Sequence, residues 1–331
     1  MNCNAHLALN RSSLCHHACI TAASGLGYLA IFPLDVLEII LLKAGARKIR
    51  AINSTLKRVF DEVNASLSIS PRRFRSSSDN DDIGLLIGNV IRSSRALVSL
   101  MIHGSVFQSA YAWSSCASER LIDAIITSWG TLKGLQTLRL PETNIGPEGA
   151  ASLAPALMAL TGLRTLDLNG NALGPAGASS LALSLMMLTD LDLGGNALGS
   201  EGAAFLAPFL MALTGLSKVK LGYNDLGPAG AASLATSLIS LAALKMLDLS
   251  HNNIGPAGAA SLAPAFMALT ALKKLDLCDN NLGPAGAASL APALIALTGL
   301  KKLNLSFNGI GSVVAASLES SLMQTLDCYI E

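Results

Sequence analysis

The sequence predicts an α/β solenoid, a right-handed horseshoe in which a parallel sheet lines the concave side and helices cover the convex side. Three observations predict it. A segment recurs at a fixed interval over residues 135–311, each copy switches from a period of two to a helical period, and each carries an asparagine at a similar place. Two copies read NNIGPAGAASLAPAFMALTALKKLDL at 252–277 and NNLGPAGAASLAPALIALTGLKKLNL at 280–305.

Each copy contains a predicted strand followed by a predicted helix. The common frame is L-x-x-L-x-L-x-x-N-x-(L/I)-G, and successive copies start 28, 25, 28, 28, 28 and 28 residues apart. The L-x-L alternation predicts a short strand, and the following G-P-x-G-A-x-x-L-A-x-x-L predicts a helix. The copies start at Leu135, Leu163, Leu188, Leu216, Leu244, Leu272 and Leu300.

Stacking of these units follows from their leucines, which one strand and one helix cannot bury alone. Strands stack about 4.8 Å apart, whereas helices with their side chains are about 10 Å across, so the stack curves with the strands inside. Because the helices are rich in alanine, glycine and serine, we expect gentle curvature. A degenerate unit at the C-terminus is expected to cap the stack.

Prolines occur at two places in the predicted helices. One set follows the loop glycine, where the first helical turn tolerates a residue without an N–H. The other set stands inside the helix and removes one hydrogen bond each, which predicts a kink or a shortened helix. This second set is Pro155, Pro208, Pro264 and Pro292.

The recurring asparagine is predicted to be structural. It stands where the strand turns away and leaves backbone groups unpaired, and its amide can both donate and accept hydrogen bonds. Each buried group left unmatched would cost about 1 to 3 kcal/mol, so a ladder is favoured over a ligand role. Its predicted members are Asn144, Asn171, Asn196, Asn224, Asn252, Asn280 and Asn308. The unit LQTLRLPETNIG carries one extra residue before Asn144.

The frame over 135–311 resembles leucine-rich repeats of the long, helix-containing type found in ribonuclease inhibitor. In such a horseshoe the residues between the leucines project from the concave face. We expect a protein partner to be anchored there by large aromatic and charged groups. The competing interpretation is a solvated surface on which Lys and Asp of neighbouring strands pair. The expected anchors are Lys220, Tyr223, Asp248, His251, Lys274 and Phe307.

Residues 32–41, FPLDVLEIIL, resemble the first helix of an F-box, with Phe32 in place of the usual leucine. The later stretch ARKIRAINSTLKRVFDEV is similar to that family's second half, although Lys48 stands where an acid is common. The resemblance implies docking to a Skp-type adaptor of a cullin-RING ubiquitin ligase. The competing interpretation is a helical cap of the solenoid. The implied docking residues are Pro33, Leu34, Val36, Leu37, Ile40 and Leu41.

These observations divide the chain into a poorly ordered tail at 1–30, an F-box-like helical module at 31–68, irregular repeats at 69–134, and seven regular repeats with a C-terminal cap at 135–331. The apolar run in the tail leaves a signal peptide or membrane anchor as an alternative. Cys15, His16, His17 and Cys19 lack a second ligand pair at zinc spacing, so no metal is expected.

Composition narrows the function. The chain is 51% hydrophobic with a mean hydropathy of +0.50, but asparagine and Gly-Pro-Ala-Gly interrupt each uncharged run before the about 20 apolar residues of a membrane span. The balance of 23 basic and 22 acidic residues argues against a nucleic-acid partner. Six scattered cysteines favour a reducing compartment, the cytoplasm or else the nucleus.

No nucleophile–base pair, phosphate loop or pair of catalytic carboxylates stands at a usable spacing. We therefore predict a binding protein, with no catalysis, cofactor, metal or small-molecule substrate. The leading hypothesis is a substrate receptor of an SCF-type ubiquitin ligase that holds its target on the concave face. The alternatives are a repeat scaffold or inhibitor without a role in ubiquitin transfer, and a regulator similar to the Ran GTPase activator.

Overall fold

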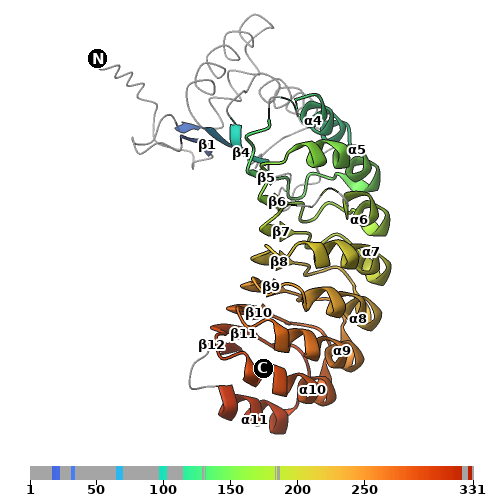
Figure 1. Ribbon diagram of the computed structural model, residues 1–331, viewed down its shortest axis with the longest axis vertical. Helices are drawn as coiled ribbons and strands as arrows, with labels where there is room; N and C mark the ends of the chain where they lie inside the picture. Colours follow the sequence, from blue (N-terminus) through green and yellow to red (C-terminus); the bar gives the residue numbers. More distant parts are fainter. Residues whose placement is uncertain are drawn as a thin grey trace, which may run out of the picture.

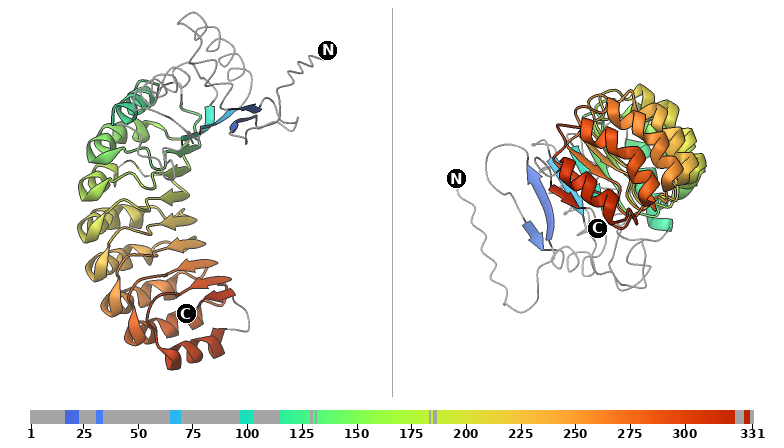
Figure 2. Two further views of the ribbon diagram at one scale, coloured as in Figure 1. Left: turned by 180° about the vertical axis from the view of Figure 1, so that it is seen from behind. Right: turned by 90° about the horizontal axis from the view of Figure 1, so that it is seen from below.

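The computed structural model describes residues 17–22, 31–33, 65–69, 97–102, 115–128, 130, 132–182, 184, 187–322 and 327–329. Within these ranges, twelve strands form one sheet in the order β12-β11-β10-β9-β8-β7-β6-β5-β4-β3-β1-β2. From α4 onward, helices alternate with the strands. Figures 1 and 2 show the strands along the inner side of an arc and the helices along its outer side. The predicted α/β horseshoe is therefore confirmed.

The strands are β1 (His17–Ala22), β2 (Ile31–Pro33), β3 (Ala65–Ile69), β4 (Leu97–Ile102), β5 (Thr137–Arg139), β6 (Thr165–Asp167), β7 (Asp190–Asp192), β8 (Lys218–Lys220), β9 (Met246–Asp248), β10 (Lys274–Asp276), β11 (Lys302–Asn304) and β12 (Asp327–Tyr329). The helices are α4 (Ser115–Ser128), α5 (Gly146–Ala159), α6 (Gly174–Ala182), α7 (Gly199–Ala212), α8 (Gly227–Leu238), α9 (Gly255–Ala268), α10 (Gly283–Ala296) and α11 (Ser312–Leu322).

The sheet is parallel from β3 to β12, and each strand pairs with the next in the chain. Equivalent residues of successive repeats face each other, as Leu247 faces Leu275 between β9 and β10. Strand β1 instead pairs antiparallel with β2 and β3. Parallel pairing in register follows from units of similar length that share one chain direction.

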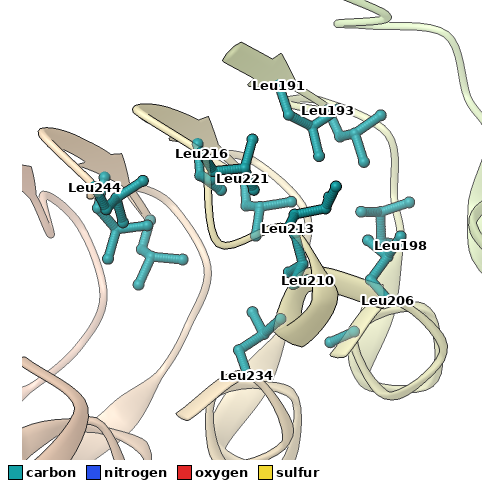
Figure 3. Close-up of a cluster of buried hydrophobic side chains, with 14 of the residues drawn as sticks. Leu191, Leu193, Leu198, Leu206, Leu210, Leu213, Leu216, Leu221, Leu234 and Leu244 are labelled. Atoms are coloured by element: carbon teal, nitrogen blue, oxygen red, sulfur yellow. The ribbon is translucent and has the colours of Figure 1, made fainter. Parts of the chain in front are cut away.

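A continuous core lies between the sheet and the helices and runs from Leu100 in β4 to Leu318 in α11. Figure 3 shows one section of it, where Leu191 and Leu193 of the sheet side meet Leu206 and Leu210 of α7. All four are at most 2% exposed. Since burying one leucine contributes about 1.5 to 3 kcal/mol, this core is the main source of the protein's stability.

The asparagine ladder closes the inner turns. The Asn252 amide nitrogen donates to the carbonyl oxygens of Leu221, Leu249 and Ser250, and its Oδ1 accepts from the N–H of Asn224, at 3.0 Å, and of Leu226. Equivalent bonds hold Asn171, Asn196, Asn224, Asn280 and Asn308. Each ladder asparagine is at most 2% exposed.

Asn144 is not a member of this ladder, which corrects the sequence alignment. Asn144 is exposed, whereas Thr143 is fully buried in the ladder position. The Thr143 hydroxyl donates to the Leu140 carbonyl at 2.9 Å, and the Thr143 N–H donates to Asn171 Oδ1 at 3.0 Å. A fixed number of residues separates the third leucine of the frame from the ladder, and Thr143 stands at that distance from Leu140.

The prolines inside the helices do not shorten them. Helices α5, α7, α9 and α10 each run 14 residues with a proline inside, whereas α6, without one, has 9. Pro155 is exposed, and so is Ala151, whose carbonyl would have bonded the missing N–H. Water can satisfy that carbonyl on the outer surface, so the lost bond costs little.

Small residues bring neighbouring helices together. A Cβ added to Gly258 of α9 would lie 3.0 Å from the Ala231 Cβ and 3.1 Å from the Pro228 Cα of the preceding repeat, which is closer than ordinary packing.

Helices α8, α9 and α10 contain no charged residue, which accounts for the high mean hydropathy. Among the described residues, no helix combines the length and apolar character needed to cross a bilayer.

At the N-terminus, the docking residues implied by the F-box resemblance fall outside the described residues, except Pro33, which ends β2. The outside residues are Leu34, Val36, Leu37, Ile40 and Leu41. Strand β1 lies within the segment predicted as a poorly ordered tail. The domain boundaries and the F-box-like module therefore remain predictions.

Candidate partner-binding face

The inner face of the sheet presents two side chains per strand. In each three-residue repeat strand the middle residue is buried and the outer two project. The third residues form a half-buried row along the solenoid. This row is Arg139, Asp167, Asp192, Lys220, Asp248, Asp276 and Asn304.

Lys220 is paired within this row. Its Nζ lies 2.8 Å from Asp192 Oδ2. Burial lowers the pKa of Lys220, but the hydrogen bond to Asp192 and the charges of Asp192, Asp167 and Asp248 outweigh burial and leave that pKa raised. Lys218 likewise lies 2.7 Å from Asp190 on the neighbouring strand. At β7 and β8 the face therefore carries the cross-strand pairs that the competing interpretation describes.

The aspartates of the row also hold the turns that follow the strands. The Asp248 Oδ1 accepts hydrogen bonds from the Ser250 N–H at 3.0 Å and from its hydroxyl at 2.7 Å. Asp167, Asp192 and Asp276 accept from the backbone N–H two residues later in the same way. Burial, with the nearby charge of Asp192, raises the pKa of Asp167. These carboxylates therefore stabilise the turns after the strands as well as lying on the inner face.

A second row lies on the rim, just before each ladder asparagine. In the repeats of β8 to β11 it consists of Tyr223, His251, Asp279 and Phe307. The rings of Tyr223 and His251 stack with centroids 3.9 Å apart and planes 14° apart, and His251 Nδ1 lies 2.8 Å from Asp279 Oδ2. Tyr223 is 62% and Phe307 is 75% exposed.

The rim backbone is left-handed. φ is 59° at Tyr223, 55° at His251, 52° at Asp279 and 58° at Phe307. Backbone bonds between repeats fix the turns at Tyr223 and His251, because the Tyr223 N–H donates to the Ser250 carbonyl at 2.9 Å and the His251 N–H to the Cys278 carbonyl at 2.8 Å. The Asp279 N–H donates to the Ser306 carbonyl in the same way. The side chains are therefore presented from a defined backbone and not from a loose loop.

Comparison with known proteins adds to this geometry. A family model described as Leucine Rich repeat matches residues 160–182, 184–207, 243–263, 268–291 and 297–313. These segments are leucine-rich repeats. No curated protein matches its sequence.

Among solved structures, the leucine-rich-repeat chain is similar to a structural-genomics protein from Bacteroides fragilis, with a TM-score of 0.50 and 17% identity over 77% of this chain and 72% of that one. It is also similar to an internalin from Listeria monocytogenes (TM-score 0.42, 16% identity, 86% and 94% covered). A third is TLR13 in a complex with ssRNA13 (TM-score 0.37, 18% identity, 72% and 40% covered). At these identities the similarity shows at most the fold.

Within the leucine-rich repeats, four of the six expected anchors lie on two neighbouring units. Lys220 and Tyr223 belong to the β8 unit, and Asp248 and His251 belong to the β9 unit. The last two stand in the next two units along the sheet, those of β10 and β11. These are Lys274 and Phe307.

Sequence reasoning missed a third row, directly after the ladder asparagine. Asp225, Asn253 and Asn281 stand there with φ between 51° and 54°. Together with His251 and Asp279 they line a shallow depression of about 220 Å³. The signal was a polar residue one position after the ladder asparagine in the β8, β9 and β10 repeats, where the β6 and β7 repeats carry Ala172 and Ala197. Among the described residues, no cluster of three or more His, Cys, Asp or Glu could hold a metal ion.

Proposed function

We propose that this leucine-rich-repeat protein binds a protein partner on the inner face of the β8 to β11 repeats, with Tyr223, His251 and Phe307 as anchors. The observation that carries the proposal is the left-handed backbone under exposed aromatic side chains. Aromatics presented from a defined backbone lose less entropy on binding than those on a loose loop, and aromatics are common among the residues that dominate binding energy.

The left-handed turn does not need these side chains. In the β6 and β7 repeats, Gly170 and Gly195 stand at the same position with φ of 66° and 64°. A residue with a Cβ is strained there by about 1 to 3 kcal/mol. Four successive repeats nonetheless carry a non-glycine residue. Bulky residues such as tyrosine and phenylalanine rarely adopt this conformation, so their retention at exposed positions favours a role in recognition.

Site-specific photocrosslinking tests this proposal. A benzophenone amino acid is placed at Phe307 or at Tyr223 on the rim, and at Met267 on the outer side as the matched control, since Met267 of α9 is 50% exposed. We expect the two rim positions to crosslink to the same protein in cell extract, identified by mass spectrometry. Met267 should not crosslink to it.

Two results would count against an inner-face partner. One is that the protein crosslinks from Met267 and from neither rim position. The other is that no protein crosslinks from the rim at all.

We also propose that the partner is recruited to an SCF-type ubiquitin ligase through residues 31–68. What supports this is the F-box resemblance of residues 32–41 together with a repeat domain in the same chain. Docking of this kind needs an exposed aliphatic face on a short helix. This second proposal is independent of the first, because an inner-face partner can bind without any ubiquitin ligase.

Changing Leu37 and Ile40 to aspartate tests the recruitment. We expect the double variant to lose capture of a Skp-type adaptor, because two charges would be placed in an apolar interface. Thermal unfolding of the repeats and rim crosslinking should not change. Undiminished adaptor capture by the variant, or no adaptor captured by the unaltered chain, would favour a scaffold or inhibitor without a role in ubiquitin transfer.

A further inference from the structure

Five lysines gather at one edge of the inner sheet, where β9, β10 and β11 begin. Three directly precede these strands and two are the first residues of β10 and β11. Successive members stack one strand apart, since the Lys273 N–H donates to the Lys245 carbonyl at 2.8 Å and the Lys301 N–H to the Lys273 carbonyl at 2.9 Å. We call this set the lysine edge: Lys245, Lys273, Lys274, Lys301 and Lys302.

The lysine edge differs from the lysines of the neighbouring strand β8. Lys218 and Lys220 have ion pairs to aspartates of β7, whereas within the described part of the chain no ion pair is formed by any of the five. In strand register, Lys274 lies between Met246 and Lys302. The acid in register at this edge is Asp327, opposite Lys302 at the end of the sheet.

Repulsion within the lysine edge calls for a countercharge. Neighbouring strands are about 4.8 Å apart, and like charges directly opposite each other on a sheet are destabilising. An anionic group placed over the edge would relieve this repulsion. The lysine edge therefore favours an acidic ligand, which could be a protein or a nucleic acid.

The surroundings favour a protein over a nucleic acid. Further along the same strands stand Asp248 and Asp276, and Asp279 lies on the rim beyond them. A continuous phosphate backbone crossing the face would meet these carboxylates. A polypeptide can instead place acidic residues on the edge and other side chains on the rim. Carboxylates one helical turn apart are about 5.4 Å apart, close to the spacing of the strands.

We propose that the lysine edge binds an acidic segment of the protein partner that occupies the inner face. This inference rests on the proposed function and adds the chemistry of the partner. The acidic segment lies along β9 to β11 while the rim aromatics contact the rest of the partner. Steering by these charges also speeds association at low salt.

Fluorescence anisotropy with the full chain and a labelled oligoglutamate peptide tests the proposal. We expect binding at low ionic strength that weakens as salt is added. Lys301→Glu should weaken it at least about threefold, since one exposed charge pair is lost and one repulsion is gained. The matched control is Arg164→Glu, which makes the same charge change at the exposed, equivalent position before β6 and should leave binding unchanged.

Three results would overturn the inference: no oligoglutamate binding by the unaltered chain, an equal loss in both variants, or tighter binding of an oligothymidylate of matched charge through the same lysines. The natural partner separates this inference from the proposed function. If that partner crosslinks at Phe307 and binds the Lys301→Glu chain normally, the proposed function holds and the lysine edge fails. If oligoglutamate binds as expected and no partner crosslinks at the rim, the proposed function fails instead.

Discussion

Replacing Asn252 by leucine should lower the free energy of unfolding by several kcal/mol. Leucine fits the volume but offers no polar atom, so the N–H groups of Asn224 and Leu226 are left without a partner. The carbonyls that accept from the Asn252 amide each keep another donor. Each buried group left unsatisfied costs about 1 to 3 kcal/mol. Urea denaturation followed by circular dichroism measures the loss.

The matched control for this change is a substitution at the next residue. Asn253 is exposed and has φ of 51°, a conformation that glycine adopts without strain. Asn253→Gly should therefore leave the free energy of unfolding within about 0.5 kcal/mol of the unaltered chain. If Asn252→Leu proved no more destabilising than Asn253→Gly, the ladder would not be the structural element described above.

Much of the fold could be predicted from the sequence because leucine spacing and backbone geometry are coupled. The frame placed the strand leucines correctly, as at Leu247 and Leu275, which are at most 2% exposed. The error at Asn144 has a physical origin. Backbone spacing and not residue identity sets the ladder position, and a threonine can occupy it because its hydroxyl donates to Leu140 as the Asn171 amide donates to Leu168.

The candidate site was only partly predictable. Repeat alignment placed the rows of the inner face, because side chains alternate along a strand. It could not show that Tyr223 stacks on His251 or that His251 reaches Asp279, since these contacts depend on side-chain conformations across two repeats. Nor could it show the left-handed backbone at Tyr223 and Phe307, since glycine, asparagine, aspartate and histidine favour that conformation and bulky aromatics do not.

Phe307→Gly should weaken partner binding without lowering the free energy of unfolding. The Phe307 backbone has φ of 58° and its side chain is 75% exposed, so glycine relieves strain and removes little packing. The greater freedom of glycine in the unfolded chain offsets part of that gain. We expect the free energy of unfolding to stay the same or rise by up to about 1 kcal/mol. Partner affinity should fall at least about tenfold, as for a central interface aromatic.

Met267→Gly is the control for this prediction. Met267 is also a large exposed apolar residue, but it lies in the right-handed backbone of α9. Glycine in a helix costs about 1 kcal/mol, so this variant should lose stability. Because Met267 is on the outer side, partner affinity should not change.

The central claim is that the rim residues are held in a strained backbone for recognition. Its most direct test is isothermal titration calorimetry of the crosslinked partner against the unaltered, Phe307→Gly and Met267→Gly chains, with a thermal melt of each. We predict weak binding with full stability for Phe307→Gly, and full binding with reduced stability for Met267→Gly. Normal partner affinity of a stable Phe307→Gly chain would contradict the claim.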